Sequence, residues 1–317
     1  MSVLITGGAG FIGSHVADKA IEAGHSIAVV DNLSTGNRAN VNRRARFYRL
    51  DICSPRLEGI FKKEKPEVVI HHAAQINVRH SVKEPAFDAK VNIIGSLNIL
   101  ECARKTGVRK VIYASSGGAR YGEPEYLPCD ELHPVSPICH YGVSKHTVEH
   151  YLYLYRHLYG LDYTILAYAN VYGPRQDPKG EAGVVSIFIS RLASGEQAVI
   201  FGSGRQTRDF VYVGDVADAN ILAMRKRTRS RYFNIGTNCE TSVNQIYREI
   251  ASAMKSGLKP IHAPSVPGEI RRIRLDIRPA ARELGWKPMT GLREGVGKTV
   301  AWYIDAHKNG MRAGGRR

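Results

Sequence analysis

The chain has 317 residues and a mass of 35.1 kDa, with 43% hydrophobic and 23% charged residues. This composition is typical of a folded chain with one large or two smaller domains, and it excludes wholesale disorder. No run approaches the roughly 18 uncharged apolar residues of a spanning helix, and residues 1–8 lack the pattern of a signal peptide. We therefore expect neither a membrane span nor secretion.

The charge is strongly basic, since 45 Lys and Arg residues against 29 Asp and Glu residues leave +16. Such a balance favours anionic partners but says nothing about the fold. A nucleic-acid role would need basic residues interleaved with aromatic residues in a recognised module, and the sequence contains none. We expect a solvated basic surface and no nucleic-acid partner.

Cysteine and histidine patterns argue against a disulfide framework and against a metal site. The five cysteines are odd in number, scattered and never paired as Cys-x-x-Cys, which predicts reduced thiols in the cytoplasm. His146, Glu149 and His150 match a short zinc pattern, but no third ligand is indicated. We therefore predict that the protein binds no metal.

Short β-branched runs alternate with longer amphipathic stretches through the first half of the chain. The predicted strands are residues 3–6, 26–31, 47–51, 68–72, 110–115 and 163–168. Near-continuous apolar strands separated by helices are typical of a parallel sheet that is covered on both faces. The sequence therefore predicts a doubly wound α/β (Rossmann) fold.

A second, smaller α/β lobe is expected after residue 171. There the alternation loosens and a loop rich in Pro and Gly follows. We divide the chain into a cofactor-binding domain, residues 1–171, and a substrate-binding lobe, residues 172–317. Segments near 210–236 are candidates to return to the first domain.

A glycine-rich loop follows the first predicted strand and opens a helix. Gly7, Gly10 and Gly13 let the chain turn sharply and bring backbone N–H groups against a pyrophosphate. The second strand ends in Asp31, where a carboxylate can accept the ribose hydroxyls of an adenosine and repel a 2′-phosphate. The pattern favours NAD over NADP. Asp51, at the end of the third strand, is placed to meet the adenine or to lie in solvent.

Tyr141 and Lys145 lie one turn apart on a predicted helix that runs to about residue 159. A phenol is a poor base at neutral pH, but a nearby ammonium and a cationic nicotinamide both favour the phenolate. Ser116, at the end of a strand, is placed to hydrogen-bond to the same substrate oxygen or simply to cap a turn. The pattern favours a tyrosine base whose pKa is lowered by the neighbouring lysine.

At this point the sequence resembles the extended short-chain dehydrogenase/reductase family, and within it the nucleotide-sugar epimerases of the UDP-glucose 4-epimerase type. The resemblance covers nearly the whole chain and is carried by residues 6–13, 31–32, 51–52, 72–74, 92, 115–116, 121–122, 141 with 145, 169–175, 208–213 and 267–269.

The resemblance implies catalysis by Ser116, Tyr141 and Lys145, and it also implies a set of binding residues. Those for NAD are Gly7, Gly10, Phe11, Ile12, Gly13, Asp31, Asn32, Asp51, Ile52, Ala73, Ala74, Asn92, Tyr141 and Lys145. Those for a nucleotide-diphosphate sugar, expected to be a UDP-hexose, are Ser116, Asn170, Arg208, Glu269, Arg271 and Ile273.

The chain departs from the family pattern at several positions. Ala167 and Val266 stand where relatives commonly carry arginine, and Cys139-His140 replaces Ser-Pro before the catalytic tyrosine. Arg120 replaces a small apolar residue. Without these two guanidinium groups, we expect weaker binding of the substrate phosphates, although Arg208, Arg271 and Arg272 are available to compensate.

The leading hypothesis is an NAD-dependent epimerase that inverts the C4 hydroxyl of a UDP-hexose through a 4-keto intermediate. A 4,6-dehydratase is the nearest alternative, but family dehydratases carry an Asp-Glu couple where this chain has Gly117-Gly118. A non-catalytic NAD-binding or RNA-associated protein is the alternative from another class, although it would be expected to lose Tyr141 or Lys145.

The sequence also gives expectations for the oligomeric state and for the range of sugars that the protein accepts. Predicted helices over 86–104 and 141–159 carry more apolar and aromatic residues than one sheet face needs, and the family uses a similar pair for a four-helix dimer contact. We expect a homodimer.

Ile273 stands where some hexose-specific relatives carry tyrosine, so it either widens the pocket for an N-acetyl group or merely packs.

Overall fold

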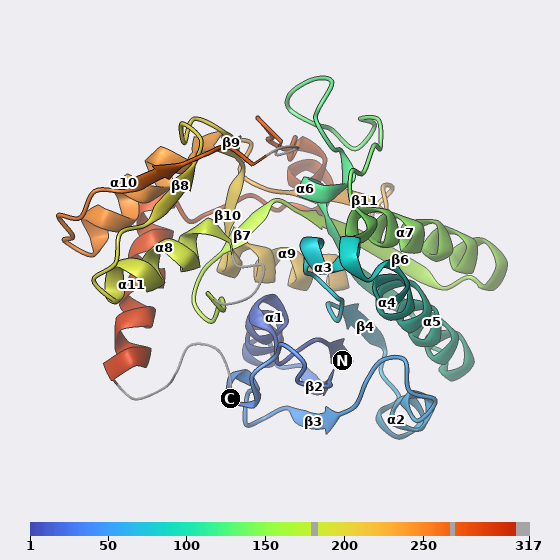
Figure 1. Ribbon diagram of the computed structural model, residues 1–317. Helices are drawn as coiled ribbons and strands as arrows, with labels where there is room; N and C mark the ends of the chain where they lie inside the picture. The colour runs from blue at the N-terminus through green and yellow to red at the C-terminus, as the bar shows by residue number, and fades with distance from the viewer. Residues whose placement is uncertain (179–182, 267–269, 309–317) are drawn as a thin grey trace.

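Figure 1 shows a computed structural model, which describes residues 1–178, 183–266 and 270–308. Seven strands form one sheet: β1 (Ser2–Thr6), β2 (Ser26–Asp31), β3 (Arg46–Arg49), β4 (Val68–His71), β5 (Lys110–Ser116), β6 (Asp162–Tyr168) and β11 (Tyr232–Ile235). They pair in the order β11-β6-β5-β4-β1-β2-β3, and every neighbouring pair is parallel. The predicted doubly wound α/β fold is confirmed.

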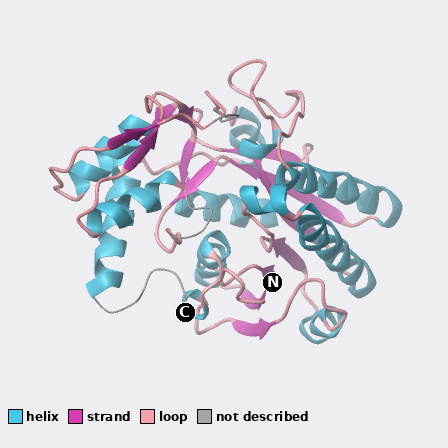
Figure 2. Ribbon diagram, viewed as in Figure 1, coloured by secondary structure: helices cyan, strands magenta, loops and turns pink. Residues whose placement is uncertain are grey.

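Helices cover both faces of this sheet, as Figure 2 shows. One face packs on α1 (Phe11–Glu22) and α9 (Val213–Arg225), and the other on α2 (Leu57–Glu64), α5 (Gly95–Thr106) and α7 (His140–Tyr159). Strand residues alternate between the faces, so that Val3 and Ile5 contact the first helix layer while Leu4 contacts the second. Burial on both sides explains why the strands read as nearly continuous apolar runs.

Most of the six predicted strands agree with the structure to within one residue at each end. The largest difference is at β3, which ends at Arg49 rather than at residue 51. There the Asp51 carboxylate accepts a hydrogen bond of 2.8 Å from the Cys53 backbone N–H, which turns the chain out of the sheet.

The predicted helix over 86–104 is divided into three segments. They are α4 (Pro85–Ala89), the wider π-helical turn η2 (Lys90–Ile94) and α5. π-helical turns of this kind often occur at functional sites, and this one contains the buried side chain of Asn92. Before α4, the chain forms α3 (Val78–Lys83).

The later part of the chain forms a separate core around Phe188, Tyr247 and Tyr303. Its helices are α8 (Val184–Ala193), α10 (Val243–Ala253) and α11 (Leu292–Lys308), and its strand pairs are β7 (Asn170–Tyr172) with β10 (Phe210–Tyr212), β8 (Val199–Phe201) with β13 (Ile261–Ala263), and β9 (Thr207–Arg208) with β12 (Thr241–Ser242). The short helix α6 (Gly117–Arg120), the 3-10 turn η1 (Arg38–Asn40) and the π-helical turn η3 (Ala280–Leu284) complete the elements.

The chain crosses between the two cores more than once. After β10, α9 packs beside α1, and β11 then forms an edge strand of the main sheet. The structure thus places residues 213–235 against the first domain. Among the described helices, none is long and apolar enough to cross a membrane.

Lys110 is a fully buried lysine that ties the start of β5 to the end of α9. Its ammonium donates hydrogen bonds of 2.7 Å to the Ala223 carbonyl and 3.1 Å to the Lys226 carbonyl. Burial lowers the pKa of Lys110 to about 8. The side chain therefore supplies donors to carbonyl groups that helix geometry leaves without an intrahelical partner.

We predict that Lys110→Met destabilises the protein by about 1–3 kcal/mol, because buried carbonyl acceptors lose their donor. Thermal and urea unfolding measure the effect. The matched control is Lys105→Met, which removes an exposed lysine 3.1 Å from Glu58, a kind of pair worth about 0–1 kcal/mol. Equal stability of the two variants would contradict this role of Lys110.

Candidate active site

The glycine loop between β1 and α1 leaves no room for side chains. Gly7 has φ +70°, and a Cβ there would lie 2.6 Å from the Ala73 backbone nitrogen. A Cβ on Gly13 would overlap the Gly7 carbonyl oxygen. Within the described chain, no side chain caps α1 at Gly10, so the first N–H groups of the helix face outward as donors for an anion. Phe11 and Ile12 form this first turn.

Asp31 closes the loop from the end of β2. Its buried carboxylate accepts hydrogen bonds of 2.9 Å from the Ala9 N–H and 2.8 Å from the Leu33 N–H. Burial raises the pKa of Asp31, and the two hydrogen bonds oppose that shift. Each carboxylate oxygen keeps a further lone pair for a ligand hydroxyl.

Asn32 and Asp51 lie next to Asp31, just after the ends of β2 and β3. The Asn32 amide donates a hydrogen bond of 2.9 Å to Asp51, which also accepts from the Cys53 N–H. Although burial opposes ionisation of Asp51, these hydrogen bonds hold its pKa below the ordinary value. Ile52 is buried behind the pair.

The chain after β4 lies directly beside the glycine loop. The Ala73 N–H donates to the Thr6 hydroxyl at 3.3 Å, and Ala74 follows it. Asn92 is buried, and its amide donates to the Gln75 carbonyl and to the Ser144 hydroxyl, both at 3.0 Å. Asn92 therefore holds this loop against α7, and a direct contact with cofactor remains a prediction.

Ser116, Tyr141 and Lys145 are brought together at the carboxyl end of β5. The Ser116 hydroxyl hydrogen-bonds to the Tyr141 phenol. It also accepts a bond of 3.2 Å from the Ala119 N–H, so it caps α6 as well as contacting Tyr141. Lys145 follows Tyr141 by one helical turn, and its ammonium lies 4.2 Å from the centre of the Tyr113 ring.

Burial governs the protonation of these groups. It raises the pKa of Tyr141 to about 12, which the hydrogen bond from Ser116 only partly offsets. It lowers the pKa of Lys145 to about 7, against the attraction of Glu149 and Asp88. In the protein chain alone Tyr141 is therefore a neutral phenol, and the phenolate expected from the sequence needs the additional positive charge of a bound nicotinamide.

The predicted substrate residues lie where the two cores meet. Asn170 begins β7, and its N–H donates to the Asp209 carbonyl at 2.9 Å. Arg208 in β9 donates to the Thr207 carbonyl at 2.9 Å. Asp209 is almost fully buried and accepts from the N–H groups of Thr237 and Leu275, which fixes the segment that contains Arg208.

The remaining predicted substrate residues lie on the segment after residue 269. Arg271 is exposed, and its N–H donates to the Glu123 carboxylate at 3.0 Å. Ile273 is 2% exposed and packs with Tyr121, Cys129 and Leu275, as the packing alternative predicts. Glu269 lies outside the described residues.

Some departures from the family pattern have clear positions. Ala167 is buried in β6 and Val266 is exposed. Arg272 makes two hydrogen bonds, 2.8 and 2.7 Å, to the Glu240 carboxylate, which occupies its guanidinium. Arg272, one of the arginines expected to compensate, is therefore already committed to a partner.

The His-x-x-Glu-His pattern forms part of a protein network. His146 and His150 approach each other at 3.2 Å, but Glu149 binds Ser115, His146 and Arg120. Among the residues that the structure describes, no group of three His, Cys, Asp or Glu is arranged to hold a metal ion.

Glu149 was missed as a site residue by the sequence analysis. Its side chain lies 7% exposed on α7, four residues after Lys145. The available signal was that spacing, which puts a carboxylate on the same helical face as the catalytic lysine.

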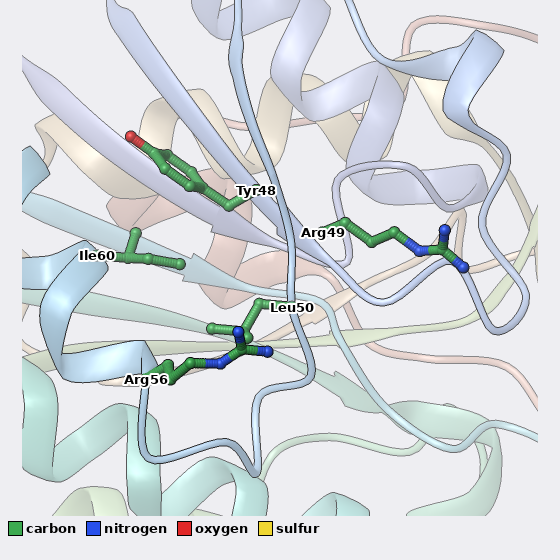
Figure 3. A pocket seen from close by; sticks show the side chains of 5 residues that line it. All are labelled: Tyr48, Arg49, Leu50, Arg56 and Ile60. Carbon is green, nitrogen blue, oxygen red and sulfur yellow. The ribbon is translucent and has the colours of Figure 1, made fainter.

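A small pocket lies beside β3, the outermost strand on one side of the sheet. Figure 3 shows its lining, which comes from β3, the chain after it and the start of α2: Tyr48, Arg49, Leu50, Arg56 and Ile60. Since β2, β1 and β4 separate β3 from β5, this pocket does not belong to the site around Ser116.

Comparisons with known proteins agree with this geometry. A profile of the NAD dependent epimerase/dehydratase family matches residues 3–236, and the chain belongs to that family.

Among individual relatives, a putative UDP-glucose 4-epimerase of Methanocaldococcus jannaschii is 51% identical over 300 residues, which cover 95% of this chain and 97% of the relative. A crystal structure of UDP-glucose 4-epimerase with UDP-glucose from Thermotoga maritima is 49% identical, with a TM-score of 0.94 over 97% of this chain and 100% of that one. A Thermus thermophilus UDP-glucose 4-epimerase in complex with NAD is 41% identical, with a TM-score of 0.91 over 96% and 100%.

NAD is the cofactor of this family, and the site fits it. Because no side chain of the described residues caps α1 at Gly10, the first backbone N–H groups of the helix are available to bind a pyrophosphate. The Asp31 carboxylate has acceptor capacity for ribose hydroxyls and would repel a 2′-phosphate.

We predict that Asp31→Asn lowers the affinity for NAD by about tenfold or more, since a hydrogen bond to a charged group is worth about 1.5–3 kcal/mol. The preference for NAD over NADP should narrow at the same time. Isothermal titration of cofactor-free protein measures both, with Asp218→Asn, which alters an exposed partner of Lys19, as the control. Unchanged NAD affinity would show that Asp31 does not bind the ribose.

Proposed function

We propose that this protein is an NAD-dependent epimerase that interconverts UDP-glucose and UDP-galactose by inversion at C4. The observation that carries the proposal is the convergence of Ser116, Tyr141 and Lys145 at the sheet edge that also bears the glycine loop. Relatives named as UDP-glucose 4-epimerases, 41–51% identical over nearly the whole chain, support it.

Tyr141 is the proton acceptor and donor in this proposal. As phenolate it removes the proton of the 4-hydroxyl, and as phenol it returns a proton to the ketone oxygen. Ser116, already hydrogen-bonded to the phenol, stabilises the oxygen on which charge develops. When bound over the glycine loop and Lys145, NAD would supply the hydride chemistry that oxidises C4 and reduces it again.

Lys145 contributes charge rather than proton transfer. Its ammonium favours the phenolate form of Tyr141 and is placed to hold a ribose hydroxyl of the cofactor. Because burial lowers the pKa of Lys145 to about 7, its charge depends on the neighbouring carboxylates of Glu149 and Asp88.

We assign the nucleotide diphosphate to the part of the second core that contains Asn170 and Arg208. Asn170 and Arg208 lie on strands tied to each other through Asp209, and Arg271 follows on the next segment. Arginine suits a diphosphate because its planar guanidinium donates in pairs.

The dehydratase alternative lacks its acid pair in this structure. A Cβ on Gly117 would lie 2.6 Å from a Leu275 methyl group, and Gly118 faces Asn170. The positions after Ser116 therefore offer no carboxylate to expel a C6 hydroxyl.

We predict that Tyr141→Phe lowers kcat for conversion of UDP-galactose by about 10²–10⁴-fold, because the proton acceptor is lost. A coupled assay for UDP-glucose measures the rate on folded, NAD-loaded protein. Tyr159→Phe, which alters the exposed tyrosine at the end of the same helix, is the matched control. Absence of epimerisation by the wild-type protein would reject the function.

A homodimer and a cytoplasmic location complete the proposal. Large exposed apolar side chains gather on α3, α4, η2 and α7, at Val82, Phe87, Ile94, Val143, Tyr153, Leu154 and Leu158. Figure 1 shows α4, α5 and α7 side by side, and Tyr155 joins α7 to Glu101 of α5 at 2.7 Å. Such a face suits a second copy of the chain. The five free cysteines support a reducing compartment.

We predict a dimer at micromolar concentration that Leu154→Glu weakens by at least about tenfold, because a carboxylate would be buried at an apolar contact. Analytical ultracentrifugation measures the equilibrium. Leu132→Glu places the same charge on a loop residue that is 90% exposed and should leave the dimer intact. A monomeric wild-type protein would remove the prediction.

A further inference from the structure

A buried ionic cluster lies behind the catalytic residues. The Glu149 carboxylate accepts a hydrogen bond of 2.7 Å from the Ser115 hydroxyl through one oxygen. Its other oxygen binds the Arg120 guanidinium and lies 2.8 Å from His146 Nδ1. The side chains of Arg120 and Glu149 are only 12% and 7% exposed.

Burial of this pair is costly, which calls for an explanation. Removing two charges from water is offset by their attraction only when the geometry and the remaining hydrogen bonds are favourable, and apolar side chains often stabilise as much. Arg120 Nε is buried without an acceptor among the described residues. Its guanidinium lies instead over the Tyr232 ring at 4.3 Å. The pair is therefore not optimised for stability alone.

The two ends of the cluster flank Ser116. Ser115 precedes Ser116 on β5, and Arg120 ends α6, the helix that the Ser116 hydroxyl caps. Glu149 binds both of these flanking residues from α7, the helix that contains Tyr141 and Lys145. One carboxylate thus connects the segment of the catalytic serine to the helix of the other two catalytic groups.

We propose that Arg120 and Glu149 are positioning residues, which clamp the segment containing Ser116 against the helix that contains Tyr141 and Lys145 and which set the charge of Lys145. The proposal rests on the proposed epimerase function. It gives the unusual residue at position 120 a role, since a small apolar side chain there would leave Glu149 without its main counter-charge.

The charge of Lys145 depends on every charged or titratable group near Lys145 itself and near Glu149. Around Lys145 these are His71 of β4, His72 directly after it, Asp88 of α4, Tyr113 of β5, and Tyr141 and Glu149 of α7. Burial, followed by the Lys145 charge, lowers the pKa of both histidines, that of His72 to about 3, so they are neutral at working pH. Around Glu149 they are Arg120, Tyr113, His146, Lys145 and Tyr232.

Opposite consequences follow for the two members of the pair. Glu149→Gln removes an anion near Lys145 but leaves the Arg120 cation, so the lysine loses its proton at lower pH. Arg120→Met leaves the anion without its counter-charge, so the lysine keeps its proton to higher pH. Activity needs the Lys145 ammonium. The alkaline limb of the kcat–pH profile should therefore move to lower pH in Glu149→Gln and to higher pH in Arg120→Met.

The experiment measures kcat, KM and the pH profile between pH 6 and 10 for NAD-loaded wild type, Glu149→Gln, Arg120→Met and the double variant. We expect each single variant to lose about tenfold or more in kcat, with KM within about twofold, because the catalytic groups are misplaced. The alkaline limb should shift by about one pH unit, downward for Glu149→Gln and upward for Arg120→Met. Glu149→Asp keeps the charge and should keep the limb in place.

The double variant and a distant carboxylate provide the controls. Without either charge, the double variant avoids an unpaired buried ion and should fold even where a single variant does not. Its alkaline limb should lie near that of the wild type while kcat remains low. Glu64→Gln removes another carboxylate paired with an arginine, Arg46, at the far edge of the sheet and should change neither kcat nor the limb.

Alkaline limbs that stay in place or move in the same direction in both single variants would overturn the proposal, as would full kcat in the double variant. An inactive wild-type protein would instead overturn the proposed function, and with it the role of the pair. The two failures are thus distinguished by the wild-type assay alone.

Discussion

The parallel direction of all seven strands in the main sheet is the constraint on which the site depends. Because parallel strands run the same way, their carboxyl ends lie at one edge of the sheet, and the loops that lead from these strands into the helices lie there too. The glycine loop after β1, Asp31 at the end of β2 and Ser116 at the end of β5 therefore meet on one side of the molecule. The catalytic helix α7 reaches the same edge with its first turn, which contains Tyr141.

Buried carboxylates hold the loops at this edge in place. Asp31 accepts from an N–H group in the glycine loop and from one in the chain after β2, and Asp209 accepts from N–H groups of two segments distant in sequence. Glu149 joins β5, α6 and α7. Each of these side chains gains hydrogen bonds that repay its burial, and each leaves a neighbouring charged or catalytic residue with a fixed position. The site is thus shaped by internal acceptors as much as by its exposed donors.

The second core supplies a different kind of contact. Its helices α8, α10 and α11 pack around aromatic residues, and its short strands pair with one another and not with the main sheet. Two of these strands contain Asn170 and Arg208, the residues that we propose bind the nucleotide diphosphate. In the proposed function, the first core binds the cofactor and the second core binds the nucleotide of the substrate. Different segments of the chain can therefore provide the contacts for each ligand.

The sequence by itself determined the fold class and the six strands of the first domain, since these depend on local periodicity and on glycine spacing. Its assignment of Ser116, Tyr141 and Lys145 as catalytic rests on the family resemblance and stays a prediction. The same local reasoning could not assign Arg120 or Glu149, whose 29-residue separation is closed only when α6 and α7 pack together. Nor could it decide that Ile273 is buried with Tyr121 or that Tyr141 is a neutral phenol in the chain alone. Burial, counter-charges and contacts between distant segments exist only in the folded chain, because they arise from packing and not from neighbouring residues.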